Sequence, residues 1–141
     1  MNMHTKKNLL NTALENGGYG KIFKVGEYDD MIVFDGSGII NEVKDAVNIC
    51  IIVDDRIYTS INFYFGKLTN INLKTNLLEY MNQRNHDDLA IKYCLDKENY
   101  IIGRSVLVMN DFNFDADAVV DFLRGVYDIV CADYEVLKRY L

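Results

Sequence analysis

Proline and tryptophan are absent from this chain of 141 residues, and it has only three cysteines and two histidines. An odd cysteine count without a C-x-x-C pair argues against a disulfide framework and against the usual zinc-ligand spacing. We expect buried free thiols in a reducing compartment, at Cys50, Cys94 and Cys131. No apolar run approaches the roughly 20 residues that span a bilayer, and Leu9-Leu10 are too short a core for a signal peptide. The expected protein is cytoplasmic, has no cofactor and does not contact a membrane.

Acidic side chains outnumber basic ones, with 21 Asp and Glu against 15 Lys and Arg, so the formal net charge is −6. A field of that sign repels phosphate backbones and favours solubility. No basic patch interrupts it, and we therefore expect no nucleic-acid partner. The composition, 50% hydrophobic and 26% charged, is typical of a globular domain. A chain of this length can bury enough surface to fold unaided, so a single domain is predicted over residues 1–141.

Alternating hydrophobicity predicts two β-hairpins. Residues 47–53 and 57–65 alternate on either side of the acidic turn Asp54-Asp55, which is typical of paired strands with one buried face. Residues 89–95 and 100–109 form a second pair around a polar turn. The last run is apolar at both odd and even positions, which indicates a central strand covered on both sides.

Two further strands are predicted before the hairpins, at residues 21–25 and 31–34. The second is expected to end in a turn at Asp35-Gly36-Ser37-Gly38, because these residue types favour turns. Residues 41–46 are interpreted as a loop or a short turn of helix.

Apolar spacing of three and four residues predicts helices at residues 5–16, at 73–81 with a frayed end to 85, and at 116–140. The expected N-caps are Thr5, Asn72 and Asp115. Gly125 inside the last helix costs about 1 kcal/mol relative to alanine, which predicts close packing or a bend there. The resulting fold is α+β, with the order α-β-β-β-β-α-β-β-α and a mainly antiparallel sheet of five to six strands with three helices.

The acidic segment at residues 111–117 resembles the start of a calcium loop, since oxygen-bearing side chains recur at every second position. Ala116 stands where such a loop needs glycine, however, and Phe122 stands where it needs a bidentate glutamate. The alternative is a polar connection from strand to helix, with Asp115 as the helix cap and the other acids near the positive end of the helix dipole. The second interpretation is favoured.

Other possible catalytic features are weaker still. Residues 17–20 and 35–38 are glycine-rich, but neither has the spacing of a dinucleotide or phosphate loop. His86 lies between polar residues after a helix, and the paired aspartates fall in predicted turns. No nucleophile, base and orienting acid can be assigned together, and we therefore expect a protein that is not an enzyme.

The second face of the predicted sheet is the most informative feature. Pairing the two hairpins aligns one set of side chains: Cys50, Ile52, Tyr58, Tyr64, Ala90 and Cys94. These would lie beside Ile101, Leu107 and Met109, or beside the residues of opposite parity in that strand. If three helices cover one face only, this tyrosine-bearing surface is left for an interface. The alternative is that the long helix or the first strands cover it.

With these elements in place, residues 9–141 resemble the YbjN-like proteins, which share the fold of the type III secretion chaperones. Three segments carry the resemblance. The helix Leu77-Leu78-Glu79-Tyr80-Met81-Asn82-Gln83-Arg84-Asn85 is similar to the family's Leu-Leu-x-x-x-Asn-x-x-Asn, the hairpin from Ala90 follows it, and an acid-capped amphipathic helix runs from Asp115 to Leu141. The resemblance implies an α/β sandwich, homodimers, protein binding and no catalytic residues.

The sequence thus predicts a non-enzymatic protein-binding module, chaperone-like or regulatory, that forms a homodimer and binds a protein client. The predicted binding residues are Ile52, Tyr58, Tyr64 and Cys94. Two alternatives stay open. One is an acidic immunity or inhibitor protein that neutralises a basic partner. The other, less favoured, is a divalent-metal-dependent enzyme built around residues 111–117.

Overall fold

A computed structural model describes residues 1–39 and 46–141, so the segment interpreted as a loop or helical turn at 41–46 lies outside the described residues apart from Ala46. The elements confirm the predicted α+β order. They are α1 (Met3–Asn16), β1 (Phe23–Glu27), β2 (Met31–Ile39), β3 (Ala46–Asp54), β4 (Tyr58–Lys67), a 3-10 turn (Ile71–Leu73), α2 (Lys74–Asp87), β5 (Lys92–Leu95), β6 (Tyr100–Val108), α3 (Ala116–Leu137) and a final 3-10 turn (Lys138–Tyr140).

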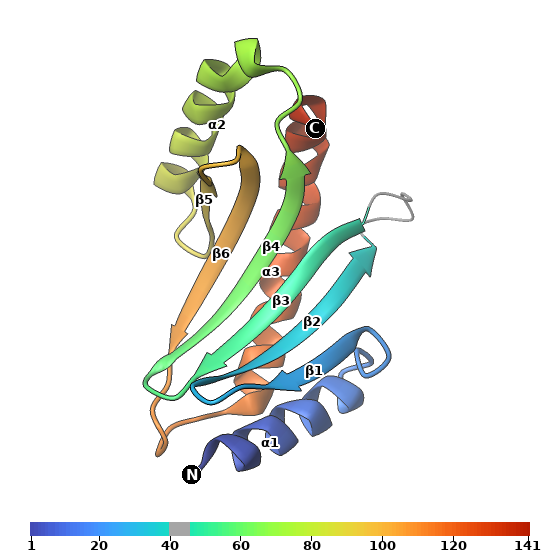
Figure 1. Cartoon of the computed structure of the whole chain (residues 1–141), viewed down its shortest axis with the longest axis vertical. Coiled ribbons are helices and arrows are strands. Elements are labelled where there is room, and N and C mark those ends of the chain that lie inside the picture. Colours follow the sequence, from blue (N-terminus) through green and yellow to red (C-terminus); the bar gives the residue numbers. More distant parts are fainter. Residues whose placement is uncertain (40–45) are drawn as a thin grey trace.

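The strands form one antiparallel sheet of six strands in the order β1-β2-β3-β4-β6-β5. Figure 1 shows α3 crossing behind the middle of this sheet. Helix α1 packs against α3 near the β1 edge, and α2 packs beside β5 at the opposite edge. The molecule therefore has two layers, and we call the side of the sheet that α3 covers the helix face.

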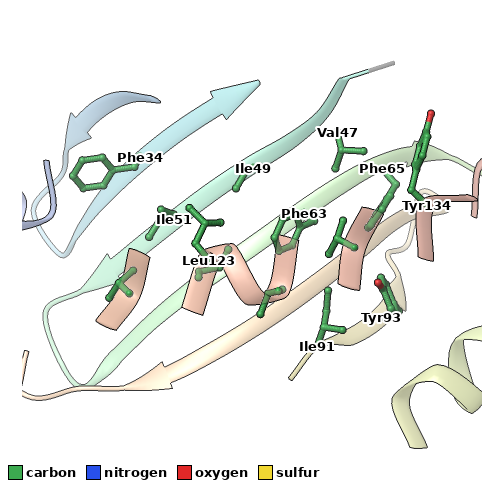
Figure 2. Packing of buried hydrophobic residues seen from close by; sticks show 14 of the residues in the cluster. Phe34, Val47, Ile49, Ile51, Phe63, Phe65, Ile91, Tyr93, Leu123 and Tyr134 are labelled. Atoms are coloured by element: carbon green, nitrogen blue, oxygen red, sulfur yellow. The ribbon is translucent and has the colours of Figure 1, made fainter. Parts of the chain in front are cut away.

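The core lies between the helix face and α3. Odd-numbered residues of β3 and β4, such as Ile51 and Phe63, are buried there, as their alternation predicted. Leu123 of α3 packs into the same cluster (Figure 2). At one end of the cluster Phe65 stacks on Tyr134, with ring centroids 6.5 Å apart, and contacts the Tyr93 ring at 5.9 Å. The hydrophobic effect on this one side of the sheet holds the two layers together.

Two expectations about the strands are wrong. Strand β2 does not end at Asp35 but runs to Ile39, and Gly36 pairs with Phe23 on one side and Ile49 on the other. A Cβ at Gly36 would come within 2.8 Å of the Phe23 ring, so the glycine allows close approach inside a strand. Strand β6 is not covered on both sides, because it lies next to the edge strand β5 and exposes Val106 away from α3.

The helix ends also differ from the predictions. Asn2 caps α1, since its side chain accepts a hydrogen bond from the Thr5 backbone N–H at 2.8 Å. Before α2, the side chain of Asn70 accepts from the Asn72 N–H at 3.0 Å, so Asn72 is not the cap. The predicted cap of α3 is confirmed, with Asp115 accepting from the Ala118 N–H at 3.1 Å.

Gly125 lies on the exposed side of α3, and a Cβ built there would meet no atom within 4 Å. The close packing expected at this position is therefore not found. We expect Gly125→Ala to raise the free energy of unfolding by about 0.5–1 kcal/mol, because alanine restricts the unfolded chain at no steric cost in the helix. Urea denaturation measures the change. Gly66→Ala is the control of opposite sign, since Gly66 has a φ of 132° that disfavours a side chain. An unchanged or lower value for Gly125→Ala would contradict the prediction.

Candidate protein-binding face

The side of the sheet opposite α3 carries no helix in the described part of the chain (Figure 1). We call it the open face. Cross-strand pairing and alternation place on it Met31, Val33, Asp35, Asn48, Cys50, Ile52, Asp54, Tyr58, Ser60, Asn62, Tyr64, Lys92, Cys94, Ile102, Arg104, Val106 and Val108. The four predicted binding residues, Ile52, Tyr58, Tyr64 and Cys94, all belong to this set.

The parity of β6 on the open face is the second of the two alternatives left by the sequence. Ile101 is buried on the helix face, and Leu107 and Met109 pack against the same core. Ala90 also packs against that core and does not join the open face. The residues that β6 contributes instead are Ile102, Arg104, Val106 and Val108.

The end of the open face near the β3–β4 turn is apolar and accessible. Tyr58 is 46% exposed and pairs across the strands with Val108, which is 64% exposed. Val106, 50% exposed, pairs with Ser60, and Ser60 pairs in turn with the half-buried Ile52. Large apolar side chains left together in water on one surface are typical of an interaction site.

A polar row crosses the middle of the same face. Asn62 is 0% exposed although no described helix covers it. Its side-chain oxygen accepts from Arg104 Nε at 2.6 Å, and its nitrogen donates to the Cys50 carbonyl at 3.2 Å and to the Ser60 hydroxyl at 3.0 Å. The satisfied amide holds the exposed Arg104 guanidinium beside Asn62 of the neighbouring strand β4. A positive charge therefore lies on the open face next to the apolar group that includes Val106.

The thiols differ from the expectation that all are buried. Each is free, but only Cys50 is buried, Cys131 is half-buried and Cys94 is exposed. Burial, followed by the negative charge of Asp35, raises the pKa of the Cys50 thiol to about 11. At neutral pH this thiol stays protonated and is a poor nucleophile.

One edge of the sheet is closed by a side chain. The amide of Asn85, on α2, accepts from the Tyr93 backbone N–H at 2.7 Å and donates to the Tyr93 carbonyl at 2.9 Å. Asn85 thus takes the place of a neighbouring strand along β5. Lys92 adds to the closure, since its ammonium donates to the Asn85 carbonyl at 2.5 Å. Such devices prevent other chains from pairing with an edge strand.

A buried ionic cluster joins α2, α3 and β5 away from the open face. Asp133 forms an ion pair with Arg84 Nε at 2.8 Å and accepts from the Tyr93 hydroxyl at 2.5 Å. The Tyr80 hydroxyl donates to the same carboxylate at 3.4 Å. Burial is the largest cause that raises the pKa of Tyr80, to about 12, and the Asp133 charge adds to it. Each side chain of the cluster forms a hydrogen bond or an ion pair with another member, which indicates a structural role.

The acidic segment at 111–117 has structural partners. Asp111 binds the buried Lys6 ammonium at 2.7 Å, and Asp115 caps α3. Hydrogen bonding by that ammonium lowers the pKa of the Asp111 carboxyl. Among residues 1–39 and 46–141, no three His, Cys, Asp or Glu side chains lie together as metal ligands. None of the helices described is long and apolar enough to cross a membrane.

The predicted positions omitted several polar residues that shape this part of the molecule. Lys6 stands on the same helix stripe as Leu10, and Asp133 stands on the buried stripe of α3 between Val130 and Leu137. A charged residue at a position where the helix pattern expects an apolar one is the signal that could have identified Lys6 and Asp133. Asn62 and Arg104 carried no such signal, because their meeting depends on strand register. In comparisons with known proteins, neither a family model nor a curated protein matches this chain.

Proposed function

We propose that this chain is a non-enzymatic protein-binding module, chaperone-like or regulatory, that works as a homodimer and binds through its open face. The observation that carries the proposal is the exposed group of Tyr58, Val106 and Val108 on a sheet whose other side packs against helices. The resemblance to YbjN-like proteins and secretion chaperones is part of the same proposal. The order of elements is compatible with it.

The physical support is the cost of leaving these side chains in water. Each Å² of apolar surface removed from water contributes about 25 cal/mol, so a sheet face that excludes solvent can drive association. Tyrosine suits such a surface because its ring is buried while its hydroxyl keeps a hydrogen-bonding partner at the rim. The Asn62 amide in the middle of the face already has its hydrogen-bond partners, so covering it leaves no unpaired amide group.

Tyr58→Glu tests this function. A carboxylate buried among apolar side chains is unfavourable, so we expect the dissociation constant of the homodimer to rise at least about tenfold. Light scattering and sedimentation over a dilution series measure it. Leu78→Glu is the matched control, because Leu78 is 44% exposed on α2, away from the open face. Equal mass and equal dissociation for wild type and Tyr58→Glu, with both folded by circular dichroism, would show that the open face is not the binding surface.

A further inference from the structure

We propose that two copies of this chain pack open face to open face about a two-fold axis that runs along the strands, between β3 and β4. The inference rests on the proposed function and adds the geometry of the contact. Sheets that pack face to face keep their strands within about 30° of each other and lie about 10 Å apart. A two-fold axis along the strands reverses the strand order, so β6 of one copy faces β2 of the other and β4 faces β3.

The polar row of the open face selects this axis. Cross-strand pairing places Asp35, Cys50, Asn62 and Arg104 in one line across β2, β3, β4 and β6. Reversing that line puts Arg104 opposite Asp35 of the second copy, twice in the dimer, with Asn62 opposite Cys50 between them. Two pairs of opposite charge then stand on either side of the axis.

The competing axis lies across the strands, along the polar row itself. It keeps each strand over its own copy, so Arg104 would meet Arg104 and Asp35 would meet Asp35. Bringing like charges together in an interface from which water is excluded is strongly unfavourable. Charge therefore favours the axis along the strands over an axis along the polar row.

The apolar residues agree with the axis along the strands. In the next row, Val106, Ser60, Ile52 and Val33 occupy β6, β4, β3 and β2. Reversal places Val106 opposite Val33 and Ser60 opposite Ile52. In the row beyond, Val108 comes opposite Met31, and Tyr58 comes opposite Asp54. Apolar side chains thus meet apolar side chains on β2 and β6.

The net charge of the chain also favours this face over the rest of the surface. Two copies with a formal charge of −6 each repel one another. The open face does not share that excess, since Asp35 and Asp54 are offset by Lys92 and Arg104. At the ends of the polar row, the same axis brings Lys24 opposite Lys92 of the second copy. These two charges lie at the rim of the contact, where solvent screens them, and the Lys92 ammonium is held by the Asn85 and Asp88 carbonyls of its own chain.

Engineered cysteines test the geometry. Strands β2 and β6 are three strand spacings apart, roughly 14 Å, so residues 33 and 106 of one chain cannot form a disulfide. In a background of Cys50→Ala, Cys94→Ser and Cys131→Ser, we expect Val33→Cys/Val106→Cys to give a covalent dimer on a non-reducing gel, while neither single variant does. A covalent dimer from either single variant alone would place residue 33 or residue 106 against its own copy, which the proposed axis does not allow, and would overturn the proposal.

A charge exchange provides the second arm. Arg104→Glu and Asp35→Arg should each raise the dimer dissociation constant at least about tenfold, and the double variant should restore it to within a few-fold of wild type. No recovery in a folded double variant, together with no cross-link, would overturn the proposed geometry. If Tyr58→Glu still dissociates the dimer in that case, the proposed function stands and only the axis is wrong. A wild-type chain that is monomeric at all concentrations overturns both.

Discussion

Replacing Asp133 with alanine is expected to lower the free energy of unfolding by about 3–5 kcal/mol, the range for removing one partner of a buried ion pair. The Asp133 side chain is only 7% exposed and faces Arg84 at 2.8 Å. Its loss leaves a guanidinium that is 22% exposed, with Asp88 at 3.3 Å as its one acidic partner among the described residues. It also leaves the buried Tyr93 hydroxyl without its acceptor. Most of the cost therefore comes from the groups left behind.

Chemical denaturation at neutral pH measures the effect, and two controls define it. Asp128→Ala changes an exposed acid on the same helix and should alter stability by less than about 0.5 kcal/mol. Tyr80→Phe removes only the 3.4 Å hydrogen bond and should cost about 1 kcal/mol or less. An Asp133→Ala variant as stable as Asp128→Ala would mean that the cluster contributes nothing to holding α2 against α3.

The parts of the fold that could be predicted are those in which one face of an element is buried. In β4 the alternation of Ile61 and Phe63 with the polar Ser60 and Asn62 follows directly from the single helix layer. The N-cap of α3 at Asp115 could also be predicted, because it depends only on residues close in the chain. Local chemistry and one-sided burial are properties of the sequence itself.

The features that could not be predicted depend on contacts between segments distant in the chain. Gly36 looked like a turn residue, but the Phe23 ring that covers it makes it part of a strand. The open face was predicted to exist, yet its β6 residues could not be chosen because both parities of that strand are apolar. The pairing of β4 with β6 shifts register between Tyr64 and Gly66, and no local sequence pattern predicts this shift. Arg104 and Asn62 meet in the regular part of the same pairing, which joins segments 42 residues apart in the chain.

The β5 edge carries the second large effect. Asn85→Ala is expected to lower the free energy of unfolding by about 2–3 kcal/mol, because it removes both hydrogen bonds to the Tyr93 backbone. Tyr93 is only 4% exposed, so water cannot fully replace the lost partners. Urea denaturation measures the loss, and Asn82→Ala, at an exposed position of the same helix, is the matched control.

The same substitution tests whether this chain must restrict its contacts to one surface. Without Asn85, β5 presents an open N–H and C=O to other chains, which is a template for edge-to-edge pairing. We expect the folded variant to form species larger than the dimer as concentration rises in light scattering, while Asn82→Ala does not. A less stable variant that keeps the wild-type mass at every concentration would show that Asn85 only stabilises the fold. Closing β5 would then have no part in directing association to the open face, and the choice of surface would have to come from the side chains of that face alone.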